Sequence, residues 1–277
     1  MDSKQRAMLV NEVNILRKLQ NPHIVRYMDR SVDKEMKIIY IVMEFCPGGD
    51  LQSLIRETRA CRSYIREDQI WLSLSELAVA LKDCHCGPEV ILHRDIKPGN
   101  VFIDGDGHVK LGDFGLARSL TNDLASTYLG TPVYMSPEIN AGLKYDEKSD
   151  IWALGCVIYE MAALMTPFQG TDQKVLKANI QSAQLQRFSS RYSDSLWNIV
   201  SWMLEKDPMK RPNVHQILEY RNVALTLNTN RIRKELGIVR EKTHELQILM
   251  EKLRERERIV NETEKRIRRG SENIVNF

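Results

Sequence analysis

The order of apolar and polar residues predicts strands early in the chain, after a first helix. Apolar residues at helical spacing predict that helix within residues 2–19, and Asn21-Pro22 is expected to end it. Residues 24–28 and 38–43 have the composition of strands, and a polar turn near residues 33–35 separates them.

Helical periodicity dominates the chain from residue 51 onward. Residues 51–85 show an amphipathic helical pattern, whereas residues 90–118 are predicted to form short strands and loops dense in Gly, Asp and His. After Pro137 the pattern is helical again. Its apolar runs, such as residues 151–165, lack a polar face, so these helices are predicted to be buried.

The composition shifts near residue 219, and the segment beyond it is crowded with Arg, Lys and Glu. One apolar position recurs there every seven residues, which is the spacing of a coiled-coil seam. Its members are Leu225, Ile232, Val239, Leu246, Leu253, Val260, Ile267 and Ile274.

The second seam that a zipper needs is weak. One register supplies Asn228, Glu235, Lys242 and Leu249, and the other supplies Leu236, Thr243 and Met250. Gly237 and Gly270 weaken the helix further. A dimeric coiled coil is the favoured interpretation, while a lone solvated helix and packing onto the globular part both stay open.

Composition and charge narrow the class of protein. The 277 residues are 43% hydrophobic and 28% charged, which is typical of a globular protein. The net charge of +3 is small, and the Arg and Lys of the tail alternate with Glu, so nucleic-acid binding is not expected. No apolar run approaches the roughly 18 residues needed to cross a bilayer, and no signal-peptide core follows Met1. We therefore expect no membrane association and a cytoplasmic or nuclear location.

The five cysteines are scattered and odd in number, which favours reduced thiols over a disulfide framework. Cys84-His85-Cys86 could suggest a metal site. No second cluster has ligand spacing, so an ordinary helix end is the favoured interpretation.

Two short segments carry the decisive chemistry. Residues 93–100 read His-Arg-Asp-Ile-Lys-Pro-Gly-Asn, and Asp113-Phe114-Gly115 follows. Phosphoryl transfer from ATP needs a carboxylate beside the attacking hydroxyl and oxygen ligands that hold Mg²⁺ on the phosphates. These two segments offer such groups, in the order and spacing of the catalytic and metal loops of protein kinases.

Further motifs follow in kinase order, and together residues 1–219 resemble a serine/threonine protein kinase. They are Gly130-Thr131-Pro132, Ser136-Pro137-Glu138, residues 150–155 (Asp-Ile-Trp-Ala-Leu-Gly) and Arg211-Pro212. The strings at residues 111–118 and 130–138 resemble the NIMA-related kinases. Residues 11–16 and the downstream zipper look most like the centrosomal, leucine-zipper branch.

The resemblance implies an α+β, bilobal kinase fold with ATP and Mg²⁺ as cofactors. By that resemblance Asp95 orients the substrate hydroxyl and Lys97 steadies the transferred phosphate. Asn100 and Asp113 bind Mg²⁺.

The nucleotide pocket is assigned by the same resemblance. Glu12 lies on the helix that presents a glutamate to the ATP-anchoring lysine. Met43 looks like the gatekeeper, residues 44–46 (Glu44 to Cys46) look like the hinge, and Phe102 looks like the floor beneath the adenine. Met43 and Phe102 are expected in the apolar core.

The remaining implied roles concern support and regulation. Glu138 and Arg211 should form a buried ion pair, and Asp150 should brace the catalytic-loop backbone. Arg94 could clamp a phosphate on the activation segment, where Thr127 is the candidate phosphorylation site. Thr131 is expected to hydrogen-bond the catalytic loop.

The sequence as written offers neither a glycine-rich strand-turn-strand nor a strand lysine before Glu12. We therefore expect a kinase truncated at its N-terminus, through an incomplete gene prediction or a splice form. Impaired catalysis and a loose small lobe with an uncovered sheet edge should follow.

These observations predict three regions and one main function. Residues 1–46 should be the remnant of the small lobe, 47–219 the large lobe and 220–277 a helical zipper. The expected function is transfer of the ATP γ-phosphate to Ser or Thr of protein substrates, in cell-cycle or centrosome control, by a homodimer. The alternative is a non-catalytic kinase-like scaffold that dimerises through its tail.

Overall fold

The computed structural model describes residues 17–275, apart from residues 34–35, 37, 115–117 and 120–131. The chain divides into two compact units, residues 1–227 and residues 228–277. The first unit is of the α+β class, with few strands and a mainly helical large lobe, as the sequence predicted.

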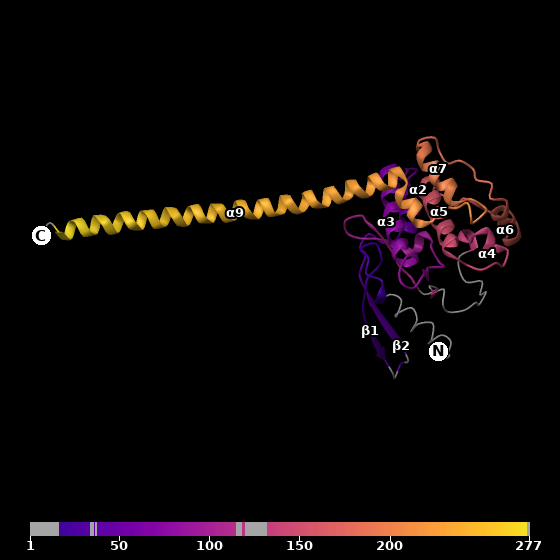
Figure 1. Cartoon of the computed structure of the whole chain (residues 1–277), viewed down its shortest axis with the longest axis horizontal. Helices are drawn as coiled ribbons and strands as arrows, with labels where there is room; N and C mark the ends of the chain where they lie inside the picture. Colours follow the sequence, from indigo (N-terminus) through magenta and orange to yellow (C-terminus); the bar gives the residue numbers. More distant parts are fainter. Residues whose placement is uncertain (1–16, 34–35, 37, 115–117, 120–131, 276–277) are drawn as a thin grey trace. The chain divides into compact units, whose positions relative to one another are not determined.

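A two-stranded antiparallel hairpin is the main β element (Figure 1). It comprises β1 (Tyr27–Asp33) and β2 (Ile38–Met43), with Val32 opposite Ile39. The predicted start of the first strand is wrong, because Ile24 instead forms a parallel bridge with Leu111 of the large lobe. The strand also continues through Asp33, where a turn was expected.

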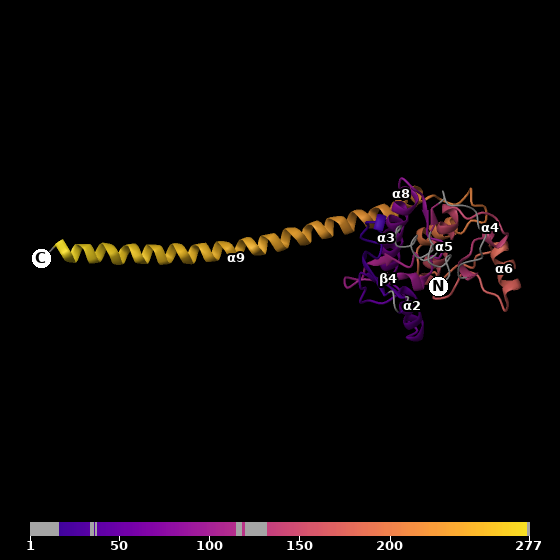
Figure 2. The same ribbon diagram turned by 90° about the horizontal axis from the view of Figure 1, so that it is seen from below.

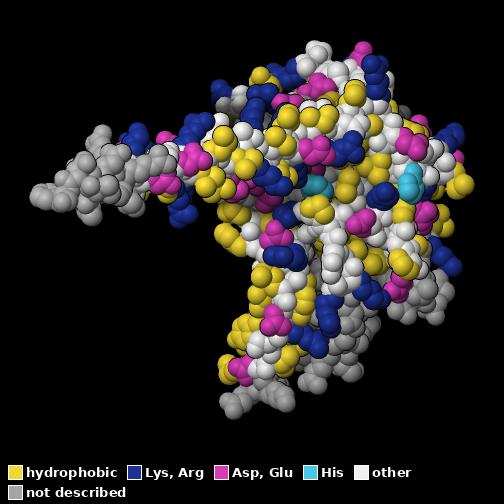
Figure 3. Space-filling view, turned by 60° about the vertical axis from the view of Figure 1, so that its left-hand side comes forward, with side chains coloured by type: hydrophobic (Ala, Val, Ile, Leu, Met, Phe, Trp, Pro, Cys, Tyr) yellow, Lys and Arg dark blue, Asp and Glu magenta, His cyan; other side chains and the backbone are white. Residues whose placement is uncertain are grey.

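Both faces of this hairpin expose large apolar side chains. Met28, Val32, Tyr40 and Val42 are each about half exposed. Figure 3 shows hydrophobic side chains gathered along the hairpin. Within the described residues no further strand pairs with β1 or β2.

The helical pattern of residues 51–85 forms two helices and not one. They are α2 (Leu51–Ala60) and α3 (Glu67–His85). The break follows from backbone conformation, since Arg62 has a φ of 51° and a left-handed residue cannot continue an α-helix.

Short strands and a 3-10 turn connect α3 to the helices that follow. β3 (Ile91–Leu92) pairs with β6 (Arg118–Ser119), and β4 (Val101–Ile103) pairs with β5 (Val109–Leu111). The turn η1 (Pro98–Asn100) leads directly into β4, which lies against α2 (Figure 2). These elements carry the residues of the predicted catalytic and metal loops.

The core of the large lobe is built around α5 (Glu147–Ala163), which contacts α3 and α7. Nearly all of its side chains are buried, as predicted from the missing polar face. Gly155 allows this packing, because a β-carbon there would lie 2.9 Å from Met203 Cβ. The other elements of this part are η2 (Pro132–Tyr134), α4 (Pro137–Asn140), α6 (Gln173–Ser182), α7 (Asp194–Met203) and α8 (Val214–Glu219).

The last element is α9 (Arg221–Val275), a helix of 55 residues. Its first turns belong to the first unit, where Val223 is fully buried. From residue 228 to residue 266 nearly all side chains are exposed within the single chain. None of the described helices is both long and apolar enough to span a membrane.

Candidate active site

The loop after β3 brings Asp95, Lys97 and Asn100 into direct contact. Lys97 Nζ donates to Asp95 Oδ2 at 2.6 Å, and Asn100 Nδ2 donates to the same oxygen at 3.0 Å. Asn100 Nδ2 also donates to the Asp95 carbonyl at 2.8 Å. Asp95 and Asn100 are buried, so these hydrogen bonds fix the carboxylate in one orientation.

His93 connects this loop to the loop that holds Asp113. Its Nδ1 accepts a hydrogen bond from the Asp95 amide at 3.3 Å, so Nε2 must carry the proton that it donates to the Gly112 carbonyl at 3.0 Å. Burial lowers the pKa of His93, which keeps the ring neutral. The ring also packs edge-on against Phe114, with centroids 4.6 Å apart.

A backbone hydrogen bond connects the loop of Asp113 to the loop of Asn100. The Gly112 amide donates to the Asn100 carbonyl at 2.9 Å, which places the residue before Asp113 on the catalytic loop. Asp113 has a φ of 56°, a left-handed conformation that costs energy for a residue other than glycine. Its side chain is exposed while Phe114 is fully buried. The backbone hydrogen bond from Gly112 to Asn100 therefore joins the loop that carries Asp95 and Asn100 to the loop that carries Asp113.

The carboxylate of Asp150 in α5 holds the backbone of the catalytic loop. It accepts hydrogen bonds from the backbone amides of His93 and Arg94, both at 3.0 Å. His85 Nε2 at 2.9 Å and the Tyr145 hydroxyl at 2.7 Å complete its partners. Burial alone would raise the pKa of Asp150, but the hydrogen bonds from His85 and Tyr145 lower it below its usual value. The carboxylate is therefore charged and fully satisfied.

Arg94 adopts a φ of 70°, and the hydrogen bond from its amide to Asp150 accompanies this unusual conformation. Its guanidinium lies 5.6 Å from the centre of the Tyr145 ring, within cation–π range. Tyr145 thus contacts both Asp150, through its hydroxyl, and Arg94, through its ring.

Glu138 and Arg211 form a bidentate ion pair in the large lobe. Nη1 and Nη2 of Arg211 each lie 2.7 Å from a carboxylate oxygen of Glu138, and Ser149 Oγ donates a third hydrogen bond to that carboxylate. The remaining Arg211 donors reach backbone carbonyls, and its guanidinium lies 4.9 Å from the centre of the Trp152 ring. Burial opposes ionisation of Glu138, yet the Arg211 hydrogen bonds lower its pKa. This pair joins α4 to the segment before α8.

The predicted adenine side of the pocket is more open than expected. Met43 ends β2 with 44% of its surface exposed, so its expected burial in the core is wrong. It lies at the end of an exposed two-stranded hairpin, which provides too few neighbours to bury it. Phe102 of β4 is half-buried. Gly112 permits its position, because a β-carbon there would lie 2.8 Å from the Phe102 ring.

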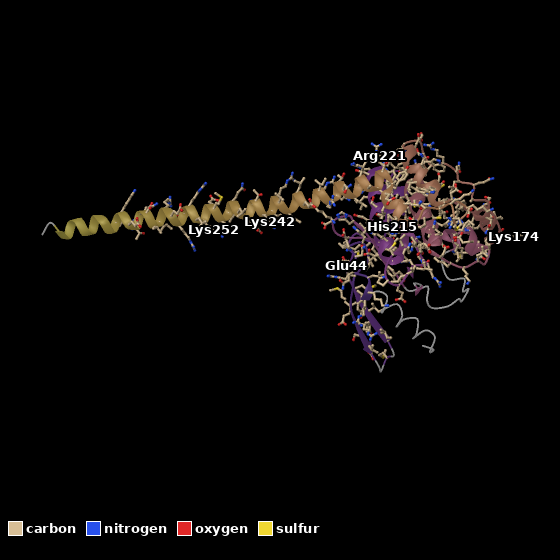
Figure 4. All side chains as sticks on the ribbon, viewed as in Figure 1. Glu44, Lys174, His215, Arg221, Lys242 and Lys252 are labelled. Atoms are coloured by element: carbon tan, nitrogen blue, oxygen red, sulfur yellow. The ribbon has the colours of Figure 1, made fainter. Side chains whose placement is uncertain are left out.

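The residues predicted as the hinge leave β2 toward α2. The Glu44 amide donates to the Arg26 carbonyl at 2.9 Å, and its carboxylate pairs with Lys110 Nζ at 2.8 Å. Figure 4 labels Glu44 next to the hairpin. Burial would raise the pKa of Glu44, but the Lys110 hydrogen bond lowers it. Cys46 is half-buried, and burial raises the pKa of its thiol. Three predicted residues, Glu12, Thr127 and Thr131, lie outside the described residues.

Sequence reasoning did not find the partners of several site residues. His85 and Tyr145 contact Asp150, and Lys110 contacts Glu44, but the chain separates His85 from Asp150 by 65 positions. No periodicity or short motif links such distant positions. The clue available for His85 was its place in a Cys-His-Cys triplet, which pointed to a different chemistry.

The fold and these loops are those of a protein kinase, and a comparison with protein families agrees. The protein kinase domain model matches residues 1–223, so the chain belongs to the protein kinase family.

Curated relatives refine the assignment. "Probable serine/threonine-protein kinase nek2" of Dictyostelium discoideum is 47% identical over 234 residues, covering 84% of this chain and 56% of the relative. "Serine/threonine-protein kinase Nek2" of Homo sapiens is 49% identical over 224 residues, covering 79% of this chain and 50% of the relative. "G2-specific protein kinase nimA" of Emericella nidulans is 35% identical over 303 residues, covering 97% and 43%.

These similarities confirm the predicted NIMA-related type of serine/threonine kinase. The chain spans about half the length of the curated relatives that it matches.

Proposed function

We propose that this chain transfers the γ-phosphate of ATP to serine or threonine hydroxyls of protein substrates, with Asp95 as the residue that orients the attacking hydroxyl. The observation that carries the proposal is the geometry of Asp95. Its Oδ2 is held by Lys97 and Asn100, whereas within the described residues Oδ1 makes no hydrogen bond. A fixed carboxylate with one available oxygen suits a group that accepts a hydrogen bond from a substrate hydroxyl.

Lys97 would act on the other side of the same reaction. Its ammonium group lies 2.6 Å from Asp95 and is about a quarter exposed, so it is both anchored and accessible. A cation in this position would stabilise the charge on the phosphoryl group as it moves toward the hydroxyl.

Asn100 and Asp113 fit a magnesium site. The Nδ2 of Asn100 donates to Asp95, so its amide oxygen does not face that carboxylate, and the Asp113 side chain is exposed on the neighbouring loop. Carboxylate and amide oxygens are ligands that Mg²⁺ prefers. When bound, Mg²⁺ would neutralise charge on the ATP phosphates and hold them in place. This chain's own contribution is to fix both oxygen donors on loops joined by the Gly112 amide.

A phosphate-transfer assay tests the proposal. The chain would be assayed alone and fused behind the glycine-rich strands and strand lysine of a complete protein kinase domain, with a basic protein as acceptor. We expect activity in the fusion, and Asp95→Asn should lower it by about 10²-fold or more. Asp106→Asn, in the exposed turn before β5, is the matched control. No transfer from either form would favour the non-catalytic scaffold.

The exposed seam of α9 supports a homodimer. Six seam residues from Leu225 to Val260 are each 50–60% exposed in the single chain. A helix with a regular apolar stripe gains stability when a second helix covers it. A second copy supplies an identical stripe, so dimerisation through α9 is proposed. It would also bring two kinase units together and favour phosphorylation of one copy by the other.

The cellular setting is proposed from the relatives. Three of the fungal relatives are named G2-specific protein kinases. We therefore propose a role in the cell-division cycle for this chain, at the centrosome or in the nucleus. Localisation of the tagged chain through the cell cycle would test this role. A distribution that includes neither the centrosome nor the nucleus would contradict it.

A further inference from the structure

A cysteine and a histidine far apart in the sequence meet at the end of α3. Cys86 follows the last residue of α3, and its Sγ lies 3.1 Å from Nε2 of His215 in α8. Figure 4 labels His215 in the helical part of the first unit. Both side chains are exposed, and among the described residues neither hydrogen-bonds to residues 93–100 or to Asp113.

A thiol within hydrogen-bond distance of an imidazole is a nucleophile beside a base. The thiolate is the reactive form of cysteine, and the imidazole nitrogen can accept the proton that the thiol must lose. Both members of the pair lie at the surface, where a small molecule in solution can reach them.

The other cysteines lack this combination. Cys84 and Cys156 are buried, and burial strongly raises the pKa of both thiols. Burial also raises the pKa of Cys46. Cys61 is exposed like Cys86, but within the described residues no histidine contacts it. Cys61 is therefore a natural internal control.

A cavity of about 340 Å³ lies beside Cys86, and its lining includes Lys18, Lys82 and Gly87. A volume of this size can hold part of a small peptide-like molecule. Lys18 is paired with Glu89 at 2.7 Å, whereas Lys82 forms no ion pair within the described residues. The acidic lining residue, Asp83, accepts a hydrogen bond from Asn21. Lys82 is thus available to a carboxylate on a ligand.

We propose that Cys86 is a modification site that forms a mixed disulfide with a small anionic disulfide of the glutathione type. His215 takes the thiol proton, and the Cys86 thiolate attacks one sulfur of the disulfide. A new S–S bond forms to Cys86 as the original S–S bond breaks. The leaving thiolate takes the proton back from His215, so atoms and electrons balance without another oxidant. Lys82 attracts a carboxylate of the incoming molecule.

The test uses the full chain and glutathione disulfide, with the mixed disulfide at each cysteine measured by peptide mass spectrometry. We expect Cys86 to react roughly threefold or more faster than Cys61 in the same sample. His215→Gln should reduce the Cys86 rate to that of Cys61 and leave Cys61 unchanged. Lys82→Ala should slow the reaction of glutathione disulfide but not that of the uncharged hydroxyethyl disulfide.

His244→Gln, an exposed histidine of α9, is the matched control for the His215 variant and should change neither rate. The comparison of Cys86 with Cys61 in the unaltered chain does not depend on any variant folding. Equal rates at the two cysteines would overturn the proposal, as would a Cys86 rate that His215→Gln leaves unchanged.

Discussion

At the scale of single residues, buried charges in this protein depend on complete sets of partners. Arg211 directs hydrogen bonds to Glu138 and to three backbone carbonyls, and it has almost no exposed surface. An ion pair of this kind adds less stability than its geometry suggests, because both charges lost water on folding. Removing one member is nevertheless costly, since the other charge is left alone in the interior.

We predict that Arg211→Met lowers the free energy of unfolding by about 3–5 kcal/mol. Glu138→Gln should also destabilise the fold, but the double variant should lose less than the sum of the two single losses. Urea unfolding followed by circular dichroism measures all four proteins. Strictly additive losses would show that the two side chains do not interact.

Acid should weaken the fold through the same carboxylate. The pKa of Glu138 is lowered from its usual 4.5 in the folded chain, so its ionised form stabilises the fold above that value. This contribution is lost as the pH falls through the lower, folded pKa. The stability advantage of the unaltered chain over Glu138→Gln should therefore shrink below about pH 4.5.

Glu160 provides a control of opposite sign. Burial raises the pKa of Glu160, so its charge costs stability at neutral pH, while the Tyr134 hydroxyl still donates to it at 2.8 Å. Glu160→Gln should stabilise the chain at neutral pH, with a difference that disappears as the pH falls through the raised pKa. Unfolding curves of the unaltered chain and of Glu160→Gln, measured across this pH range, test the interpretation. Equal stability of the two proteins at every pH would contradict it.

At the scale of elements, two helical glycines have opposite surroundings. A β-carbon at Gly155 in α5 would meet Met203 Cβ at 2.9 Å and Leu204 at 3.0 Å, whereas Gly237 in α9 has open space. We predict that Gly155→Ala destabilises the lobe by about 1–3 kcal/mol through overpacking.

Gly237→Ala should instead stabilise α9 by up to about 1 kcal/mol, because alanine favours the helix. Thermal unfolding of the two variants, followed by the helical circular-dichroism signal, measures both changes in stability, which should have opposite signs. A stabilised Gly155→Ala variant would mean that α5 and α7 can separate without cost.

The elements also show what sequence patterns can reveal. Strand β2 and the buried helix α5 were predicted because their local pattern matches their final surroundings. The division of residues 51–85 into α2 and α3 was missed, since it depends on the left-handed Arg62 and on no proline or glycine. The exposure of Met43, the predicted gatekeeper, was missed because burial at the end of a strand depends on neighbours from other parts of a sheet. The contact between His85 and Asp150 joins positions that are 65 residues apart and leaves no local signal.

At the scale of the whole molecule, the proposed dimer makes a direct prediction. Val239→Lys with Leu246→Lys places two charges on the seven-residue seam of α9 and should convert a dimer to a monomer. Ile248→Lys is the matched control, because Ile248 is also exposed but lies off the seam. Sedimentation measures the mass of each form. A monomeric unaltered chain, or a dimer that survives the seam changes, would exclude this mode of association.

The four hydrogen bonds at Asp150 have a consequence for motion. The amides of His93 and Arg94 donate to a side chain of the buried helix α5, so we expect them to stay closed to water while α5 stays in place. Their hydrogen–deuterium exchange should be as slow as that of α5 itself, although both residues belong to a loop. The reacting loop would then keep its shape until the lobe as a whole comes apart, and heat should remove catalysis and core structure at the same temperature.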